Sequence, residues 1–359
     1  MLTSALPVPS TQHLLTAKII ATIVRDSPEI SDLIFSPGRA PQVELNGQLT
    51  EVSIPDAGVL TPDAILGIAA DLMGKNQSAQ QKLREEGSCD ISYSVPKVAR
   101  FRVNIFSQRG TLAIVMRVIP TEIPSFESLK LPPQLAEIAE LRNGIVLVTG
   151  AAGSGKSTTL AAILNKINLE KAYHIVTIED PIEFLHNHLK STIHQRELHS
   201  DTPSFALALR AALRQAPRVI VVGDLRDRET IEVAIEAAEM GHLVLSTLHT
   251  IDAAKTIERV VGAFPPSEQQ MMRARFAKSF RYIVSQRLFA RKNGGGRVAA
   301  IEILKSTLRT REYVEKGEHD GKKLLEAMHG GATEGMQDFD GVIEQMIRDG
   351  VIEFETGIS

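Results

Sequence analysis

Cysteine and aromatic residues are nearly absent from this chain. Of its 359 residues one is cysteine, Cys89, none is tryptophan, and aromatic residues make up 4%. A single cysteine excludes an internal disulfide and a four-cysteine zinc site, and it favours a reducing, cytosolic setting. Few rings are available for base stacking, and a net charge of −3 supplies no basic field, so we expect no nucleic-acid partner.

Long apolar runs are absent as well. No stretch approaches the roughly 18 consecutive apolar residues that a membrane-spanning helix needs. The N-terminal stretch MLTSALPVPSTQHLL lacks the basic start and the continuous apolar core of a signal peptide. With 43% hydrophobic and 23% charged residues, the composition is that of a soluble globular protein. The length suits two or three domains of about 150 residues each.

The first third of the chain predicts an α+β domain over residues 1–119. Apolar residues recur at helical spacing between Leu14 and Val24, and Thr61-Pro62 is an N-cap and N1 pair that begins a second helix. Five short runs predict strands: Leu33–Ser36, Gln42–Leu45, Cys89–Val95, Arg100–Phe106 and Leu112–Val118. The proline-rich stretch that follows indicates a linker, which we place at residues 120–137.

Residues 138–359 show the pattern of an α/β domain. Apolar runs alternate with helical segments such as Ser204–Arg214 and Arg228–Glu239, which predicts a parallel sheet with crossover helices. The runs are Ile145–Thr149, His174–Ile178, Val219–Val222 and Leu243–Thr247. From Ser267 onward we expect mainly helix, with a short strand at Val298–Ile303 and a final helix at Phe339–Arg348.

The stretch Gly150–Ser157, GAAGSGKS, fits the P-loop pattern G-x-x-x-x-G-K-[ST]. It follows an apolar run and precedes a helix predicted at Lys156–Lys166, so a phosphate would lie at a helix N-terminus. Backbone amides, the Lys156 ammonium and the Ser157 hydroxyl would bind nucleotide phosphates and Mg²⁺. The alternative is a glycine-rich turn without a ligand. The predicted nucleotide-binding residues are Gly150, Gly153, Ser154, Gly155, Lys156, Ser157 and Thr158.

Two acidic positions follow apolar runs of the same domain. VIVVGD ends at Asp224, a candidate for the acid that helps to hold Mg²⁺, and EDPIE supplies Glu179, Asp180 and Glu183. Carboxylates at the carboxyl ends of parallel strands lie on the ligand-binding edge of the sheet. An acid after an apolar strand is also a common coincidence, and EDPIE is alternatively a solvated acidic turn.

Two histidines flank the run LVLSTLHT. His242 precedes it and His249 lies near its end. Either is alternatively a structural residue whose ring is satisfied by its neighbours, and neither has the company of a zinc site.

Six segments follow the P-loop in a fixed order: TIEDPIEF, QREL, ALRAALRQ, VGDLRDRET, GHLVLSTLHT and VSQRL. Together with ISDLIFSPGRAPQVELNGQL and ARFRVNIFSQRG they resemble the secretion ATPases of type IV pili and type II secretion. The resemblance covers roughly residues 12–350 and is closest to the twitching-motility retraction branch, because the four-cysteine insert of the assembly branch is missing. It implies a RecA-like core with a helical C-terminal part and an N-terminal PAS-like α+β domain.

The same resemblance implies a function. The expected protein is a homo-hexameric ring at the cytoplasmic face of the inner membrane. It would hydrolyse ATP with Mg²⁺ and move an inner-membrane platform protein so that a pilus depolymerises. Ser157 and Asp224 would hold Mg²⁺ and Glu183 would orient water, while His242 and His249 would couple the nucleotide state to neighbouring segments. Arg102 and Arg117 would close over the phosphates from the PAS-like domain, with Arg109 a further candidate. Strand arginines on a solvated face are the alternative.

One departure from the family pattern bears on activity. The strand that usually ends in Gly-Glu ends here in Gly223-Asp224. A carboxylate on a side chain shorter by one methylene would miss the position of the usual Glu carboxylate by about 1 Å. A misplacement of this size costs on the order of a hundredfold in rate, unless an acid such as Glu179 compensates. Two readings stay open: an active retraction motor, and a nucleotide-binding accessory or regulatory paralogue that hydrolyses ATP weakly beside another pilus ATPase. A third, a RecA-like DNA motor, has only the shared core in its support.

Overall fold

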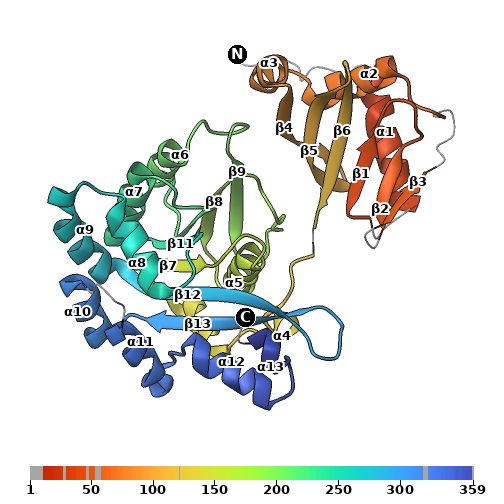
Figure 1. The fold of residues 1–359 in the computed structure, drawn as a ribbon. Coiled ribbons are helices and arrows are strands. Elements are labelled where there is room, and N and C mark those ends of the chain that lie inside the picture. Colours follow the sequence, from red (N-terminus) through yellow and green to blue (C-terminus); the bar gives the residue numbers. More distant parts are fainter. Residues whose placement is uncertain are drawn as a thin grey trace. The chain divides into compact units, whose positions relative to one another are not determined.

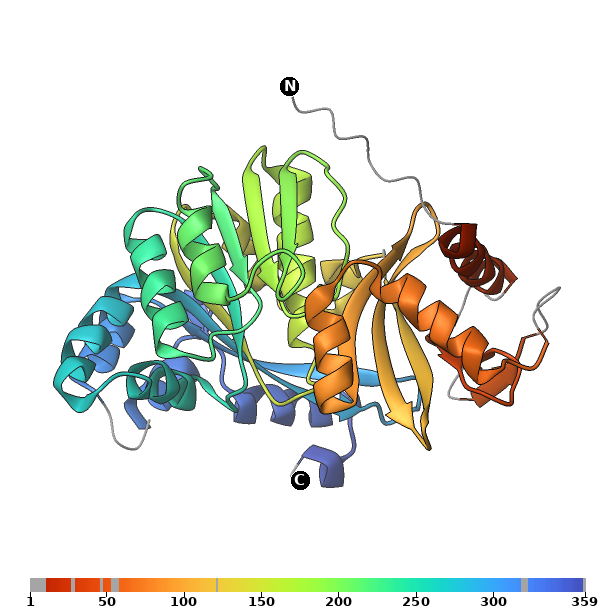
Figure 2. The same ribbon diagram turned by 90° about the horizontal axis from the view of Figure 1, so that it is seen from above.

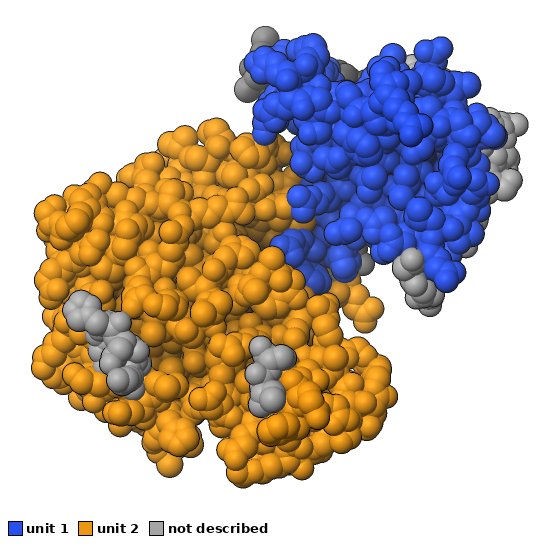
Figure 3. All heavy atoms as spheres, viewed as in Figure 1, with its two compact units in different colours: residues 1–121, 183–185 blue, residues 122–182, 186–359 orange. Residues whose placement is uncertain are grey.

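The computed structural model describes residues 11–26, 30–45, 48–52, 58–120, 122–317 and 322–357. The chain divides into two compact units, one of residues 1–121 and 183–185 and one of residues 122–182 and 186–359 (Figure 3). Each unit has its own hydrophobic core.

The first unit is a six-stranded antiparallel sheet with helices packed on one face (Figure 2). The strand order is β3-β2-β1-β6-β5-β4. The strands are β1 (Asp32–Phe35), β2 (Gln42–Leu45), β3 (Gln48–Glu51), β4 (Ser88–Val95), β5 (Ala99–Gln108) and β6 (Thr111–Ile119). The helices are α1 (Thr11–Asp26), α2 (Pro62–Met73) and α3 (Gln77–Glu86). The five strands and two helices expected from the sequence are present. Their regularly spaced apolar residues, among them Ile20, Ile65 and Val103, form the buried faces of these elements.

The second unit is built on a seven-stranded sheet of order β13-β12-β7-β11-β10-β8-β9 (Figure 1). All neighbours pair in parallel except β12 and β13, which form an antiparallel hairpin. The strands are β7 (Gly144–Thr149), β8 (His174–Glu179), β9 (Thr192–Glu197), β10 (Val219–Val222), β11 (Leu243–Leu248), β12 (Phe280–Ala290) and β13 (Arg297–Lys305). The parallel sheet predicted from the four apolar runs is confirmed by this pairing, so the second unit is an α/β fold.

Helices cover both faces of this sheet. On one face lie α6 (Phe205–Ala212), α7 (Arg228–Glu239), α8 (Ala253–Gly262) and α9 (Pro266–Ser279). The other face is covered by α5 (Lys156–Glu170) and by the 3₁₀ helix η1 (Pro133–Glu140). The C-terminal part adds α10 (Leu308–Lys316), α11 (Lys322–His329), the short η2 (Ala332–Glu334), α12 (Phe339–Arg348) and α13 (Phe354–Gly357). Among the described residues, no helix is both long and apolar enough to cross a membrane.

Two parts of the second unit differ from the sequence-based expectation. Residues 280–290 were expected to be helical, yet they form the long strand β12, whose apolar residues enter the sheet beside β7. The expected linker at 120–137 contains α4 (Phe126–Leu129) and the start of η1, and Leu131 and Leu135 are buried in the core beside α5. In both cases tertiary packing, which the local pattern does not report, decides the structure.

Candidate nucleotide-binding site

The P-loop joins β7 to α5 at the carboxyl edge of the parallel sheet. Strand β7 is buried along its whole length, and α5 begins at Lys156, directly after Gly155. Gly153 and Gly155 have φ angles of 74° and 88°, a left-handed conformation that glycine adopts without strain. Among the described residues, no side chain caps the start of α5. A helix N-terminus that follows a glycine loop in this way favours an anion.

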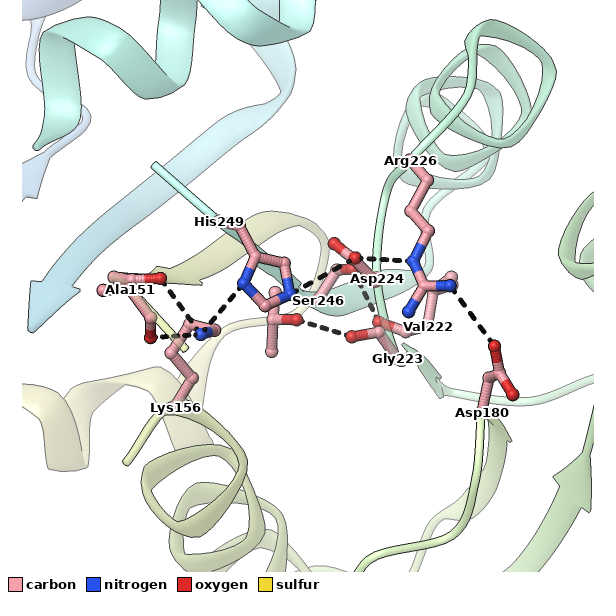
Figure 4. Close-up of polar contacts among 11 residues, drawn as sticks. Ala151, Lys156, Asp180, Val222, Gly223, Asp224, Arg226, Ser246 and His249 are labelled. Carbon is pink, nitrogen blue, oxygen red and sulfur yellow. Dashed lines mark hydrogen bonds and ion pairs between the residues drawn. The ribbon is translucent and has the colours of Figure 1, made fainter. Parts of the chain in front are cut away.

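The Lys156 side chain folds back over the loop. It is 7% exposed, and its Nζ donates hydrogen bonds to the carbonyl oxygens of Gly150 at 3.0 Å and Ala151 at 2.8 Å. Nζ also lies 3.4 Å from Nδ1 of His249, which follows β11 (Figure 4). The ammonium is thus held at the centre of the loop, where phosphate oxygens bind in a P-loop protein.

Asp224 follows β10, two strands away from β7, and is 6% exposed. Its Oδ2 accepts a hydrogen bond from Nε of Arg226 at 2.9 Å and lies 3.6 Å from Nε2 of His249. Arg226 reaches on to Oδ2 of Asp180 at 3.3 Å. A line of ionisable groups therefore runs from Lys156 through His249 and Asp224 to Arg226 and Asp180 (Figure 4). The hydrogen bond from Arg226 to Asp224 raises the pKa of the guanidinium, which keeps Arg226 charged.

Two hydroxyl groups on β11 fix the loop that carries Asp224. Ser246 Oγ donates to the carbonyl oxygen of Val222, and Thr247 Oγ1 donates to that of Gly223, both at 2.6 Å. Ser246 and Thr247 are buried, so these bonds are shielded from water. They hold the carboxyl end of β10 against β11 and so position Asp224 relative to His249.

The donor set fits a nucleotide with a divalent cation. Oδ1 of Asp224 is buried and has no hydrogen-bond partner among the described residues, as expected of an oxygen reserved for another ligand. Within the described part of the chain, no group of three or more His, Cys, Asp or Glu side chains could hold a metal alone. A cation here would use few protein oxygens and several from phosphate, as Mg²⁺ does in such sites.

The other predicted residues of this unit lie in different places. His242 precedes β11, at the opposite edge of the sheet from His249, and its Nδ1 contacts the Pro217 carbonyl at 2.9 Å. Since a strand of this length spans about 20 Å, the nucleotide-binding role expected for His242 has no support in the geometry of this chain. Glu179 accepts hydrogen bonds from Thr177 and Gln195. Glu183 is exposed and belongs to the segment that groups with the first unit.

Arg102 and Arg117 are cross-strand neighbours on β5 and β6 of the first unit. Arg117 Nε donates to Asp32 Oδ1 at 2.9 Å, while Arg102 Nε lies 4.0 Å from Asp90 Oδ1. Both side chains are more than half exposed. Arg109 occupies the tight turn between the same strands, with φ of 48°. The structure thus pairs Arg102 with Arg117 on one face of the sheet and sets Arg109 at its end.

Two residues of the site escaped sequence reasoning. Arg226 bridges Asp224 and Asp180, and Gln286 on β12 hydrogen bonds both to the P-loop and to α5. Both lie in segments that carry the family resemblance, VGDLRDRET and VSQRL. The available signal for Gln286 was its place in the family segment VSQRL, because the strand that contains it was not predicted.

A parallel sheet with a P-loop after one strand and a buried carboxylate after another defines a P-loop nucleotide-binding protein. The chain belongs to the family described as type II/IV secretion system protein, whose model matches residues 21–328. It is therefore a member of an ATPase family, in agreement with the resemblance described above.

The relatives include ATPases of type IV pili. The chain is 42% identical over 325 residues to the type IV pilus retraction ATPase PilT of Pseudomonas aeruginosa, covering 90% of this chain and 92% of that one. It is 37% identical to the type IV pilus ATPase PilU of the same organism, over 92% of this chain and 84% of the other. A crystal structure of the pilus retraction motor PilT with bound ADP matches with a TM-score of 0.83 and 40% identity, over 94% and 96% of the two chains.

Proposed function

We propose that this chain is an ATP-hydrolysing motor that drives retraction of a type IV pilus. The observation that carries the proposal is an intact P-loop, with Lys156 buried at its centre, in a chain that matches retraction ATPases over nine-tenths of its length. In this role the enzyme is a homo-hexamer at the cytoplasmic face of the inner membrane and acts on a platform protein there. A second pilus ATPase is a further partner.

Each residue of the site has a part in this proposal. Lys156 and the amides of the P-loop bind the phosphates of ATP, and Ser157 and Asp224 hold Mg²⁺. When bound, Mg²⁺ neutralises charge that develops on the phosphate oxygens. His249 lies within 3.6 Å of both Lys156 and Asp224, so it transmits a change at one to the other. Glu183 orients the attacking water.

Arg102 and Arg117 complete the site from a neighbouring subunit. They carry two exposed positive charges on one face of a domain separate from the P-loop. Positive charges of this kind can stabilise a transition state that gains negative charge. Arg102→Ala is expected to lower hydrolysis at least about tenfold while leaving ATP affinity nearly unchanged. The check is phosphate release together with binding of a fluorescent ATP analogue. Mixing Arg102→Ala with Lys156→Ala chains would restore activity if the arginine acts in trans. Equal losses of affinity in both single variants would remove this role.

The second candidate function is that of an accessory or regulatory ATPase with weak turnover. Asp224 favours it, because the shorter carboxylate is already engaged by Arg226 at 2.9 Å. The similarity to PilU, a second pilus ATPase, is compatible with it. In this case the nucleotide state of the chain, rather than its rate of hydrolysis, matters to the pilus.

Phosphate release by the purified full chain tests both functions. Lys156→Ala supplies the blank, and Asp224→Glu restores the longer side chain. We expect the parent to exceed the blank and Asp224→Glu to exceed the parent, by up to about a hundredfold. Equal turnover of parent and Asp224→Glu would show that the shorter acid costs nothing. Release at the level of the blank, with nucleotide still bound, would favour the accessory function. Absence of nucleotide binding would refute both.

A further inference from the structure

Gln286 is the buried polar residue of β12 that neither the P-loop motif nor the family roles account for. It is 3% exposed, and β12 places it next to the P-loop because Ser285 pairs with Thr149, the last residue of β7. Its side-chain Oε1 accepts a hydrogen bond from Thr159 Oγ1 at 2.8 Å. Its Nε2 donates to the Ser154 carbonyl at 2.7 Å.

From these contacts we infer that Gln286 is a positioning residue of the nucleotide site. One carboxamide holds the P-loop backbone through Ser154 and the first turns of α5 through Thr159. The loop is thereby kept in the shape that presents its amides to phosphate before any nucleotide arrives. Such preorganisation removes a conformational cost that binding would otherwise meet. The role assigned to Gln286 rests on the proposed function, since it concerns the same phosphate site.

The glycines at the two ends of the loop support this assignment. A Cβ on Gly150 would overlap the main-chain oxygen of Gln286, and a Cβ on Gly155 would lie 2.7 Å from its Nε2. Gln286 thus lies against both ends of the loop, while a Cβ on Gly150 would also overlap the Ser154 Oγ, and the φ of 88° at Gly155 favours glycine by itself. The glycines of a P-loop are usually explained by the loop alone. Here they also lie against a residue more than a hundred positions away along the chain.

The two partners of Gln286 match the two ends of its carboxamide. Thr159 offers a hydroxyl donor and Ser154 a carbonyl acceptor, and the carboxamide meets them with an acceptor oxygen and a donor nitrogen. A leucine would leave a buried carbonyl without its donor. A glutamate would do the same and add a negative charge beside the phosphate site.

The test compares Gln286→Leu and Gln286→Glu with a matched control in the full chain. Gln337→Ala is the control, because Nε2 of Gln337 donates to the carbonyl of Ile301, the residue that pairs with Gln286 across the hairpin. The control removes one side-chain amide hydrogen bond to the same hairpin and leaves the contacts of the P-loop unchanged. The first readout is hydrogen–deuterium exchange of the amides of residues 153–157 without nucleotide. The second is the affinity for a fluorescent ADP analogue.

We expect at least tenfold faster exchange at residues 153–157 in both Gln286 variants and little change in Gln337→Ala. ADP affinity should fall about tenfold in Gln286→Leu and further in Gln286→Glu. Thr159→Val should reproduce part of the loss, and its effect should not add to that of Gln286→Leu, whereas Thr159→Ser should restore parent behaviour. Exchange and affinity equal to those of the control would overturn the inference. Faster exchange in the Gln286 variants, together with a parent chain that binds no nucleotide, would refute the proposed function but not the positioning role.

Discussion

The seven-stranded sheet differs on the two sides of β7. On one side β11, β10 and β8 bring ionisable groups to the carboxyl edge, where His249, Asp224 and Asp180 form one line with Arg226 (Figure 4). On the other side the β12–β13 hairpin contributes buried polar groups whose partners are mainly backbone atoms. The first side carries the ionisable groups, and on the second side buried polar groups hold neighbouring backbone segments.

The hairpin acts on both faces of the sheet. Residues alternate between faces along a strand, and Glu302 pairs with Ser285, the neighbour of Gln286. Gln286 therefore faces α5, while Glu302 faces α8 and accepts a hydrogen bond from the Ala253 amide at 2.8 Å. Ala253 begins α8, four residues after His249. One hairpin thus anchors the P-loop and the segment that follows His249.

The largest predicted effect concerns the hairpin side of β7, where Glu302 makes the free energy of unfolding depend on pH. Burial raises the pKa of this carboxyl to about 7. Between pH of about 4.5 and 7 the folded state then binds more protons than the unfolded state, so stability falls as pH rises through this window. Glu302→Gln stays neutral and keeps an oxygen for Ala253. It should therefore be more stable than the parent by about 3 kcal/mol at pH 8 and nearly equal to it at pH 5.

Tyrosine fluorescence during urea unfolding measures this difference. The chain has no tryptophan, and Tyr173, Tyr282 and Tyr313 lie in the second unit, so the signal follows mainly the unit that contains Glu302. Glu312→Gln, on the exposed surface of α10, is the control for the charge change. An equal gain in both variants, or a gain independent of pH, would contradict a buried neutral carboxyl at Glu302.

The opposite side of the sheet holds a half-buried group with the reverse dependence. His186 precedes β9, its Nδ1 is shielded from solvent without a hydrogen-bond partner among the described residues, and burial lowers its pKa to about 4. The unfolded state binds more protons between pH of about 4 and 6.5, so this contribution to stability is full above pH 6.5 and is lost as pH falls. From pH 7 to pH 5 the parent should lose about 2 kcal/mol that His186→Leu does not lose.

The same unfolding measurement in a double variant sharpens the comparison. In the parent, the His186 and Glu302 contributions oppose each other between pH 5 and 6.5 and partly cancel. His186→Leu alone should leave a stability that falls with rising pH, and Glu302→Gln alone one that rises. Opposite slopes in the two single variants, together with a nearly flat double variant, would confirm both signs. Two single variants with the same slope would show that one assignment is wrong.

The sequence predicted the fold best where the signal is local. Strands β7 and β10 are almost wholly apolar and β11 begins with an apolar run, and α7 begins after Asp227, whose side chain accepts a hydrogen bond from the Thr230 amide. Strand β12 escaped prediction because Arg281, Ser285 and Gln286 interrupt its apolar pattern. Polar residues fit a buried strand only where other residues satisfy their hydrogen bonds. One partner of Gln286 lies on α5, which the local pattern does not reveal.

The candidate site divides in the same way. The P-loop and Asp224 were predicted because motif and strand end lie together in the sequence. His242 and His249 were both assigned to the site, although they flank opposite ends of β11. Strand direction in a parallel sheet favours His249 alone, because ligands bind at carboxyl ends. Arg226 needed the fold, since its role depends on Asp180 from a different strand.

The smallest effect we predict concerns the two hydroxyl groups that join β11 to the end of β10. Thr247→Val and Ser246→Ala each remove one buried hydrogen bond to a carbonyl, so each should cost about 1 kcal/mol of stability. Their effects on turnover should differ. Thr247 holds Gly223, the neighbour of Asp224, whereas Ser246 holds Val222 within the strand. We expect Thr247→Val to lower ATP hydrolysis several-fold and Ser246→Ala to leave it nearly unchanged, measured by phosphate release at saturating ATP. Equal turnover in both variants would mean that the position of Asp224 is set by β10 itself and by Arg226, and not by its contact with β11.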